Sequence, residues 1–332
     1  MENNKMKALV LEEFDREFVM KDLDLPQPAS GEVLVAIKAS GINPLDLKIK
    51  SGKASHAKVS LPAILGIDMA GTVAATGKGV TMFKPGDEVF GMTGGIAGVQ
   101  GSLAQYASVD QDLIAIKPPN IDFKEAASLP LAFITAWEGL VDRAAISRSK
   151  KVLIHGGAGG VGHIAVQLAR SFGAEVYATG DVANKKDIED FGAVFIDYKT
   201  QSVSDYVGAF TDGEGFDIVF DTVGGENLDR SFTAVKNYTG HVVSILGWGT
   251  HSLAPLSFRG ATYSGVFTLL PLITGKGRKH HGEILREASK LVEAGKLRGN
   301  THLGSYRLHE AEAALQMIER GLANGKIVIE ID

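Results

Sequence analysis

The glycine-rich stretch from which the fold can be predicted most directly reads Gly156-Gly157-Ala158-Gly159-Gly160-Val161-Gly162. Residues 151–155 before it are apolar and predict a strand, and residues 161–172 after it repeat apolar side chains at helical spacing. Its second, fourth and seventh residues satisfy the spacing G-x-G-x-x-G, which allows a sharp turn and a close approach of backbone N–H groups to a pyrophosphate. The N-terminus of the following helix adds unpaired donors and the positive end of a dipole. The stretch therefore predicts a dinucleotide site in which residues 158–161 hold the phosphates.

Strands and helices alternate through the middle of the chain. The expected strands are 151–155, 175–179, 194–197, 216–221 and 240–246, and the expected helices are 131–142, 161–172, 185–191, 203–210 and 228–235. Such alternation indicates an α/β fold with a parallel sheet and helices on both faces, the doubly wound Rossmann arrangement. We assign residues 131–271 to this dinucleotide-binding domain.

The two ends of the chain have a different pattern. Short strand-like runs at 6–11, 31–40, 69–76, 88–92 and 113–117 are separated by glycine and proline, which predicts a small β-barrel. After residue 271 we expect helices at 283–294 and 309–320 and strand-like runs at 301–307 and 326–331. Because the last strand needs a partner, we infer that the chain returns to the first domain, which then comprises residues 1–130 and 272–332.

The composition excludes several classes of protein. Of the 332 residues, 45% are hydrophobic and 22% are charged, as in a soluble globular chain of about two domains. The net charge is −5, from 34 basic and 39 acidic residues, so no nucleic-acid partner is expected. The chain contains no cysteine, which excludes disulfides, thiolate metal sites and a cysteine nucleophile. It has neither a long apolar run nor a signal-like core within residues 1–10, so we expect no membrane partner and a cytoplasmic location.

The residues after the expected strand 175–179 bear on the choice between NADH and NADPH. Gly180 and Asp181 follow this strand directly, and Asp181 lies 19 positions after Gly162. A carboxylate about 20 residues beyond the glycine motif typically binds the ribose 2′-OH of NAD and disfavours the 2′-phosphate of NADP. Lys185 offers a positive charge for a phosphate instead, and Asp181 has the alternative role of capping the next helix. The sequence leaves the two cofactors open.

The order of short motifs along the chain resembles that in the zinc-free quinone oxidoreductase and enone reductase branch of the medium-chain dehydrogenase/reductase superfamily. The motifs are Met6-Lys7-Ala8, Gly31-Glu32-Val33-Leu34-Val35, Asn43-Pro44-Leu45-Asp46-Leu47-Lys48, Lys84-Pro85-Gly86-Asp87-Glu88-Val89, Gly101-Ser102-Leu103-Ala104-Gln105-Tyr106, Ala126-Ala127-Ser128-Leu129-Pro130, Thr135-Ala136, the glycine stretch and Gly325-Lys326-Ile327-Val328. The resemblance implies a GroES-like β-barrel catalytic domain in addition to the Rossmann domain. It also implies NADPH as the cofactor, a small-molecule substrate and a homodimer paired through edge strands, for which residues 261–270 are the candidate.

The resemblance also bears on metal binding. Zinc alcohol dehydrogenases of this superfamily have a cysteine near Asn43 and a Gly-His-Glu motif where this chain has Gly66-Ile67-Asp68. A lone aspartate without a thiolate or imidazole ligand cannot build a tetrahedral zinc site, so no metal is expected. Without zinc the oxidation of an alcohol is difficult, whereas a quinone or an α,β-unsaturated carbonyl accepts hydride directly. We therefore expect an NADPH-dependent reductase of such acceptors, with NADH left open by Asp181.

Several site residues follow from their motif positions. Asn43 and Lys48 correspond to residues that line the nicotinamide and substrate cleft, and Lys48 is our candidate for stabilising the developing enolate or hydroquinone oxygen. Its alternative is a surface lysine. The resemblance places Thr135 near the nicotinamide, Tyr198 at the adenosine end and Lys326 near the cofactor. The alternative for Thr135 is a helix residue whose side chain bonds its own backbone. The alternative for Tyr198 is an aromatic residue at an interface, and that for Lys326 is a lysine that faces solvent. The loops that frame the nicotinamide contribute Val223, Leu246, Gly247, Val266, Phe267 and Thr268.

Two other functions are compatible with the sequence. The first is a dinucleotide-binding redox sensor or structural protein with little catalysis. The second is an enoyl thioester reductase, which needs a basic groove for coenzyme A or phosphopantetheine, and the cluster Lys276–Lys279 is the only hint of one. The basic cluster 276–281, which contains these residues, is otherwise expected to be a solvated loop. His155 and His163 flank the glycine stretch and are expected to pack or cap rather than to catalyse.

Overall fold

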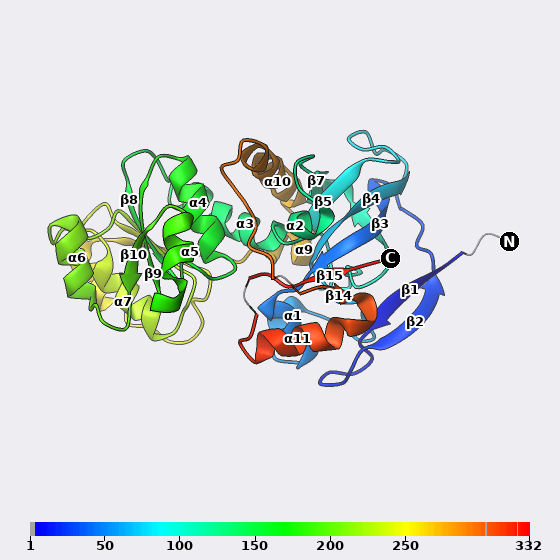
Figure 1. Ribbon diagram of the computed structural model, residues 1–332, viewed down its shortest axis with the longest axis horizontal. Coiled ribbons are helices and arrows are strands. Elements are labelled where there is room, and N and C mark those ends of the chain that lie inside the picture. Colours follow the sequence, from blue (N-terminus) through cyan, green and yellow to red (C-terminus); the bar gives the residue numbers. More distant parts are fainter. Residues whose placement is uncertain (1–3, 303, 324) are drawn as a thin grey trace. The chain divides into compact units, whose positions relative to one another are not determined.

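The computed structural model describes residues 4–302, 304–323 and 325–332. Contacts within the chain divide it into two compact units, both drawn in Figure 1. One unit comprises Met1–Leu131 and Leu269–Asp332, and the other comprises Ala132–Thr268. The second unit is therefore one continuous segment, whereas the first is assembled from both ends of the chain.

The continuous unit is built on a parallel sheet. Its strands are β8 (Lys151–His155), β9 (Glu175–Gly180), β10 (Val194–Asp197), β11 (Ile218–Asp221), β12 (His241–Ser244) and β13 (Thr262–Gly265). They lie in the order β10-β9-β8-β11-β12-β13, and every neighbouring pair is parallel. Counted along the chain this is the order 3-2-1-4-5-6 of the Rossmann fold, so the predicted fold class is confirmed.

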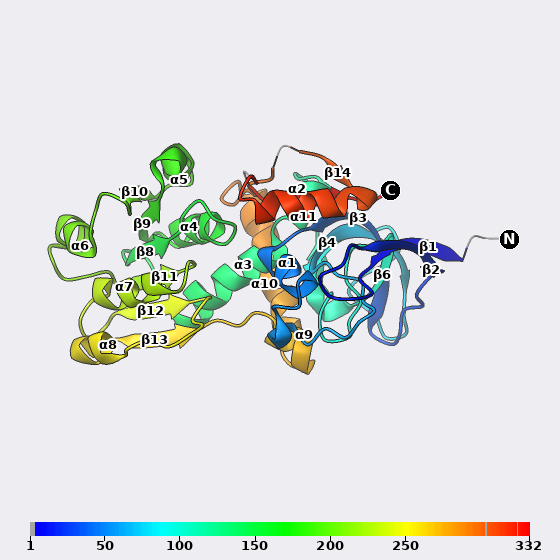
Figure 2. The ribbon, with the colours of Figure 1, turned by 90° about the horizontal axis from the view of Figure 1, so that it is seen from below.

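Helices cover both faces of this sheet, as Figures 1 and 2 show. They are α4 (Gly162–Ser171), α5 (Lys185–Asp190), α6 (Val203–Thr211), α7 (Glu226–Ala234) and α8 (Ala254–Arg259), with a 3-10 turn η4 (Val182–Asn184) before α5. α4 packs on β8 and β9, and α7 packs on β11 and β12. Because both faces are covered, β11 is buried at consecutive positions instead of alternate ones. α8 was not predicted, because its 6 residues are too few to show a helical period.

The helix predicted at 131–142 is present, but its geometry changes within its length. α3 (Pro130–Trp137) leads directly into the π-helical residues Glu138–Arg143, labelled η3. Gly139 lies in this wider turn, and a Cβ atom there would lie 2.4 Å from Cε2 of Phe220 on β11. Glycine therefore lets the turn pack closely against the sheet. π-helical turns are rare and occur frequently at functional sites.

The discontinuous unit contains a sheet of short strands, most of them antiparallel. In the described residues the order is β14-β15-β3-β4-β5-β7, with β6 paired to β3 and a separate hairpin of β1 and β2. The bounds are β1 (Lys5–Val10), β2 (Val19–Asp24), β3 (Glu32–Gly41), β4 (Asp68–Thr76), β5 (Glu88–Met92), β6 (Tyr106–Asp110), β7 (Ile114–Ile116), β14 (Tyr306–Arg307) and β15 (Val328–Glu330). β15 pairs with β3, so the end of the chain completes the sheet of its first part. β14 is shorter than the strand-like run expected at 301–307, of which Leu303 lies outside the described residues.

The helices of this unit correct one expectation. They are α1 (Pro44–Lys50), α2 (Phe123–Ala127), α9 (Leu270–Thr274), α10 (Arg278–Glu293) and α11 (Ala311–Glu319), with 3-10 turns η1 (Ser55–Ala57), η2 (Gln111–Leu113) and η5 (Leu308–Glu310). α10 begins inside the basic cluster that was expected to be a loop. His281 and Gly282 are buried there, and a Cβ on Gly282 would lie 2.7 Å from the backbone oxygen of Asp112. Tertiary packing therefore extends the helix beyond its apolar pattern.

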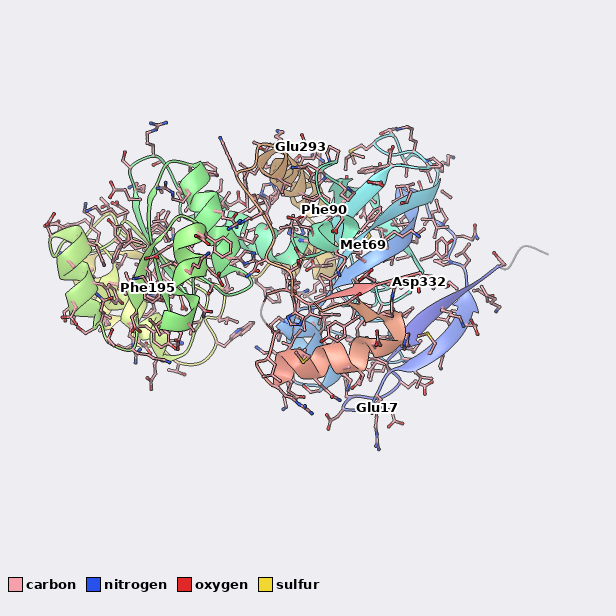
Figure 3. All side chains as sticks on the ribbon, viewed as in Figure 1. Glu17, Met69, Phe90, Phe195, Glu293 and Asp332 are labelled. Atoms are coloured by element: carbon pink, nitrogen blue, oxygen red, sulfur yellow. The ribbon has the colours of Figure 1, made fainter. Side chains whose placement is uncertain are left out.

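Apolar side chains from neighbouring strands fill the interior of the discontinuous unit. Met69 on β4 and Phe90 on β5, both labelled in Figure 3, are fully buried. Among the residues that the structure describes, no helix has the length and apolar character needed to cross a membrane.

Candidate active site

The glycine stretch forms the turn between β8 and α4. A Cβ on Gly157 would lie 2.6 Å from Cβ of Ala178 on β9, and one on Gly162 would lie 2.0 Å from the oxygen of Gly156. These glycines therefore permit the close packing of the turn. Around Gly160, in contrast, an added Cβ would meet no atom within 4 Å. Val161 occupies the N-cap of α4 and has no polar side chain to bond the first N–H groups of the helix. An open turn at a helix N-terminus fits a pyrophosphate.

The other predicted residues of this unit follow the carboxyl ends of successive strands. Gly180 ends β9, Asp181 follows it, Lys185 begins α5, Tyr198 follows β10, Val223 follows β11, Leu246 and Gly247 follow β12, and Val266, Phe267 and Thr268 follow β13. In a parallel sheet all carboxyl ends lie at one edge, and the strand order reverses direction between β8 and β11. Ligands of open α/β sheets bind at this edge, at that reversal.

Thr135 joins this edge through a hydrogen bond. Its Oγ1 lies 3.1 Å from Oγ1 of Thr268, and Thr268 donates its own hydroxyl to Oε2 of Glu138 at 2.8 Å. Both threonines are buried. Glu138 was missed by the sequence analysis, although its position three residues after Thr135 on one helix gave a signal. The carboxylate of Glu138 orients Thr268 and so connects α3 to the loop after β13.

A second missed residue, Asp221, organises the loop after β11. Its fully buried carboxylate accepts hydrogen bonds from the backbone N–H groups of Val223 and Gly224 at 3.1 Å, and from Asn227 Nδ2 at 2.8 Å. It also accepts the hydroxyl of Ser244 on β12 at 2.9 Å. Asp221 therefore fixes the backbone that carries the predicted residue Val223. An aspartate that ends an apolar strand and precedes two glycines was the available signal.

The two histidines near the glycine stretch are held by internal contacts. Burial lowers the pKa of His155 to about 4, against the opposing field of Asp221, and its Nδ1 lies 3.2 Å from Oγ1 of Thr179. Nδ1 of His163 lies 2.9 Å from the oxygen of Gly159, and the ring packs on Phe191. Both side chains therefore support the turn.

Asp181 has a capping contact and a charged partner. Its Oδ1 accepts the N–H of Ala183 at 3.1 Å, which caps the turn η4, and its Oδ2 pairs with the ammonium of Lys199. Lys199 holds the pKa of Asp181 below its usual range, and the capping bond acts in the same direction. The sequence analysis missed Lys199, which comes to Asp181 from beyond β10. Because Lys199 balances the carboxylate, Asp181 repels a 2′-phosphate less than the sequence alone suggests.

A second lysine follows Asp181 along the chain. Lys185 opens α5, where its Nζ lies 5.9 Å from the ring centroid of Phe195 and 3.8 Å from a carboxylate oxygen of Glu189. Tyr198, just after β10, is about half exposed. The ring of Tyr198 is thus open to an adenosine, while Lys185 and Lys199 each have a carboxylate partner.

In the discontinuous unit, Asn43, Asp68 and Lys326 form a buried network. Nδ2 of Asn43 and Nζ of Lys326 each donate to Oδ2 of Asp68 at 3.0 Å, and Lys326 also donates to Oδ1 of Asn43. Oδ1 of Asp68 accepts the N–H of Leu131 at 2.8 Å. The Lys326 side chain is 8% exposed and that of Asp68 is 0% exposed. Lys326 thus does not face solvent, which was the alternative expected for it.

Asp68 and Asn43 of this network, together with Ile67, lie at or near the positions where the resemblance places the metal ligands of the zinc alcohol dehydrogenases. Ile67 offers no donor atom, and both oxygens of Asp68 already accept hydrogen bonds. Within the described part of the chain, no group of three or more His, Cys, Asp and Glu side chains is arranged to hold a metal ion. These residues therefore do not fit a catalytic zinc site.

α1 carries one buried acid and one exposed base. Asp46 is fully buried, and its Oδ2 accepts the N–H of Asn43 at 2.7 Å. Burial raises the pKa of Asp46 to about 7, although the Asn43 N–H and the charge of Lys326 lower it. Lys48 lies two residues further along α1 and is exposed. The structure thus presents the ammonium of Lys48 to solvent while the ammonium of Lys326 is bound internally.

Comparison with known proteins adds independent information. Residues 29–119 match the family model "Alcohol dehydrogenase GroES-like domain", and residues 191–329 match "Zinc-binding dehydrogenase". The NADPH-dependent alkenal/one oxidoreductase of Arabidopsis thaliana is 32% identical over 98% of this chain and 79% of its own length. The quinone oxidoreductase of Homo sapiens is 30% identical over 75% of this chain and 76% of its own length. A crystal structure of an alcohol dehydrogenase superfamily protein from Novosphingobium aromaticivorans is 51% identical, covers 98% of this chain and 100% of its own, and has a TM-score of 0.96.

The parallel sheet, its glycine turn and the GroES-like unit define a nicotinamide-dependent oxidoreductase. Their sequence relatives make the assignment narrower. The chain belongs to the medium-chain dehydrogenase/reductase superfamily, in its quinone and enone oxidoreductase branch. The resemblance inferred from the motifs is confirmed.

Proposed function

We propose that this enzyme transfers a hydride from NADPH to the β-carbon of an α,β-unsaturated carbonyl compound, or to a quinone, without a metal ion. The observation that carries the proposal is the set of residues gathered at the carboxyl edge of the Rossmann sheet, in a chain whose metal-ligand positions hold Ile67 and an already bonded Asp68. The printed names of the Arabidopsis and human relatives support these two classes of acceptor.

The protein's residues have two tasks in such a reaction. A reduced nicotinamide supplies a hydride when it is bound beyond the glycine turn. Addition of hydride to the β-carbon leaves negative charge on the carbonyl oxygen, which must be stabilised and then neutralised by a proton. Lys48 suits the first task because its ammonium is exposed, whereas Lys326 already donates to Asp68 and Asn43. Water or Lys48 provides the proton.

NADPH is the proposed cofactor. Lys199 balances the charge of Asp181, so this carboxylate need not exclude a 2′-phosphate, and Lys185 at the start of α5 offers a second cation, with Glu189 at 3.8 Å as its partner. The Arabidopsis relative is named as NADPH-dependent, which supports the same choice.

The enoyl thioester alternative has less support. It needs free basic side chains in the cluster 276–279, but Arg278 pairs with Asp110 at 3.0 Å and begins α10. The redox sensor alternative predicts that NADPH binds but that no acceptor is reduced, and a panel of acceptors distinguishes the two functions.

The proposed assembly is a homodimer in the cytoplasm. β13 lies at the end of the strand order of the sheet, and three of its four residues are exposed. An exposed strand edge is stabilised by pairing with another copy of itself. Light scattering coupled to gel filtration tests the assembly, because the proposal expects twice the mass of one chain at micromolar concentration.

A panel assay tests the proposed reaction. The protein is dialysed against a chelator and supplied with NADPH or NADH and, in turn, with alkenals, cyclic enones, quinones and, with the oxidised cofactors, alcohols. We expect turnover of an enone or quinone with NADPH and no effect of the chelator. Alcohol oxidation without turnover of any enone or quinone would contradict the proposal. Tight NADPH binding without turnover of any acceptor would favour a sensor.

A further inference from the structure

Residues 246–253 belong to the loop between β12 and α8. This loop is held by a histidine that has no role in the reaction proposed above. His251 lies in this loop with its side chain 12% exposed, and its ring packs edge-on against Phe232 of α7. The same loop carries Leu246 and Gly247, which the sequence analysis placed at the nicotinamide. It also carries Trp248, which is 52% exposed and packs edge-on against Phe267 at 6.4 Å between ring centroids.

Both ring nitrogens of His251 face oxygen atoms. Nδ1 lies 3.0 Å from Oδ1 of Asp229 on α7, and Nε2 lies 3.1 Å from the backbone oxygen of Trp248. An ionised carboxylate and a backbone carbonyl can only accept hydrogen bonds. A neutral imidazole has one N–H and can donate to one of them, whereas an imidazolium donates to both. The geometry is therefore complete only when His251 is protonated.

The charges around His251 favour its protonated form. Asp229 on α7 raises the pKa of His251 most, followed by the Trp248 carbonyl, and the more distant Asp221 at the end of β11 adds to this, while burial acts in the opposite direction. The nearest cation along α7, Arg230, lies 3.7 Å from a carboxylate oxygen of Glu226. A raised pKa means that the folded state binds the proton more tightly. The double contact is therefore complete at acidic pH and is lost as the pH rises through the pKa of His251.

We propose that His251 is a positioning residue: as an imidazolium it ties the backbone of Trp248 to Asp229, and so holds the ring of Trp248 against Phe267 on the substrate side of the hydride-transfer site. The proposal rests on the proposed function, because in that function the substrate lies next to the nicotinamide, where Leu246 and Gly247 of this loop are expected. Its structural part, the proton-dependent closure of the loop, is independent of any reaction.

Two variants separate the contacts of His251. His251→Gln keeps a polar side chain of similar reach but cannot become a cation that donates at both ends. Asp229→Asn keeps an oxygen acceptor and removes the negative charge, so it lowers the pKa of His251 without removing the ring. His280→Gln is the matched control, because His280 also faces a carboxylate, Glu283, at 3.4 Å, but lies on α10 of the other unit.

The first readout needs no substrate. Hydrogen–deuterium exchange of residues 246–253 in the full chain, corrected for intrinsic rates, is measured from pH 5.5 to 8.5. We expect the loop of the unmodified protein to lose protection as the pH rises. His251→Gln should abolish this dependence, Asp229→Asn should move it to lower pH, and His280→Gln should leave it unchanged. A pH-independent loop in the unmodified protein, or unchanged protection in both loop variants, would overturn the proposal.

The second readout is the pH profile of enone or quinone reduction with NADPH. We expect His251→Gln to lower kcat/KM by about 3- to 10-fold below neutral pH, mostly through a higher KM, in line with the loss of one or two hydrogen bonds. A loop that loosens with no change in KM or kcat/KM would overturn the positioning role. If the unmodified enzyme reduced no acceptor, the proposed function would fail, whereas the exchange data would still show whether His251 closes the loop.

Discussion

Lys48 and Lys326 are two lysines of one unit with opposite environments. The ammonium of Lys326 is buried between Asp68 and Asn43, and that of Lys48 is exposed on α1. The resemblance to the reductase branch gave both a place near the cofactor, but only the structure shows that one of them is already bound within the protein. We therefore propose that Lys48, the exposed lysine, stabilises the developing oxyanion.

The prediction for Lys48 is a loss of rate rather than of binding. Lys48→Met should lower kcat for enone reduction by about 10- to 100-fold, somewhat less than the loss of a fully enclosed oxyanion donor. The dissociation constant of NADPH should change little, which fluorescence titration checks. Lys53→Met, an exposed lysine just beyond α1, is the control. Equal effects of the two substitutions would rule out the assignment.

Asp46 makes the stability of the protein depend on pH. Burial raises its pKa in the folded state to about 7 from the ordinary 3.8, so the folded state binds more protons than the unfolded state between these values. Stability due to this group therefore falls as the pH rises from about 4 through 7 and stays low above it. Asp46→Asn keeps an acceptor for the Asn43 N–H but cannot ionise. The decrease in the free energy of unfolding with rising pH should therefore be smaller in this variant by about 2–4 kcal/mol. Urea unfolding at pH 5 and pH 8 measures it, and an identical pH dependence in the variant would contradict the account.

The residues that sequence reasoning missed share a physical cause. Glu138 and Lys199 act through partners that are distant in sequence, Thr268 and Asp181, and Asp221 joins its own loop to Ser244 of the next strand. A motif records spacing along the chain, and these contacts depend on which strand ends lie next to each other. The glycine turn and the replacement at Gly66-Ile67-Asp68 were predictable because each is contained in a short segment.

The turn between β8 and α4 shows how a single element was predicted almost completely. Its strand, turn and helix follow from hydrophobic pattern and glycine spacing, while the π-helical end of α3 and the early start of α10 do not. The difference lies in what determines each element. The turn is set by local geometry, whereas η3 and the first residues of α10 are set by packing against other elements of their own units.

Two glycines of this turn should respond differently to the same substitution. Gly162→Ala places a Cβ 2.0 Å from the oxygen of Gly156, so we expect it to lower the melting temperature and to weaken NADPH binding. In Gly160→Ala the Cβ meets nothing within 4 Å, so the fold should keep its stability while the open turn becomes narrower for a phosphate. We expect at least a tenfold weaker NADPH affinity for Gly160→Ala. Calorimetry and fluorescence titration measure the two effects, and equal melting temperatures for the two variants would be the contrary result.

The whole chain combines a Rossmann unit of six parallel strands with a unit assembled from both chain ends. Amino-acid composition and net charge limited the class of protein. The order of the motifs indicated the superfamily, because the motifs run in that order from one end of the chain to the other. The identity of the acceptor lies beyond the reach of these patterns, since it depends on side chains from several loops. The chemistry of the reaction is nevertheless testable without knowing the natural substrate.

The most direct test of the proposed reaction is the transfer of deuterium from labelled NADPH to a simple enone. The protein is incubated with NADPH deuterated at C4, each stereoisomer in turn, and the product is analysed by NMR and mass spectrometry. Hydride addition to an activated alkene predicts a saturated ketone that carries the label on its β-carbon, from one of the two stereoisomers. An allylic alcohol with the double bond intact and the label on the former carbonyl carbon would contradict it, because that product requires activation of the carbonyl itself.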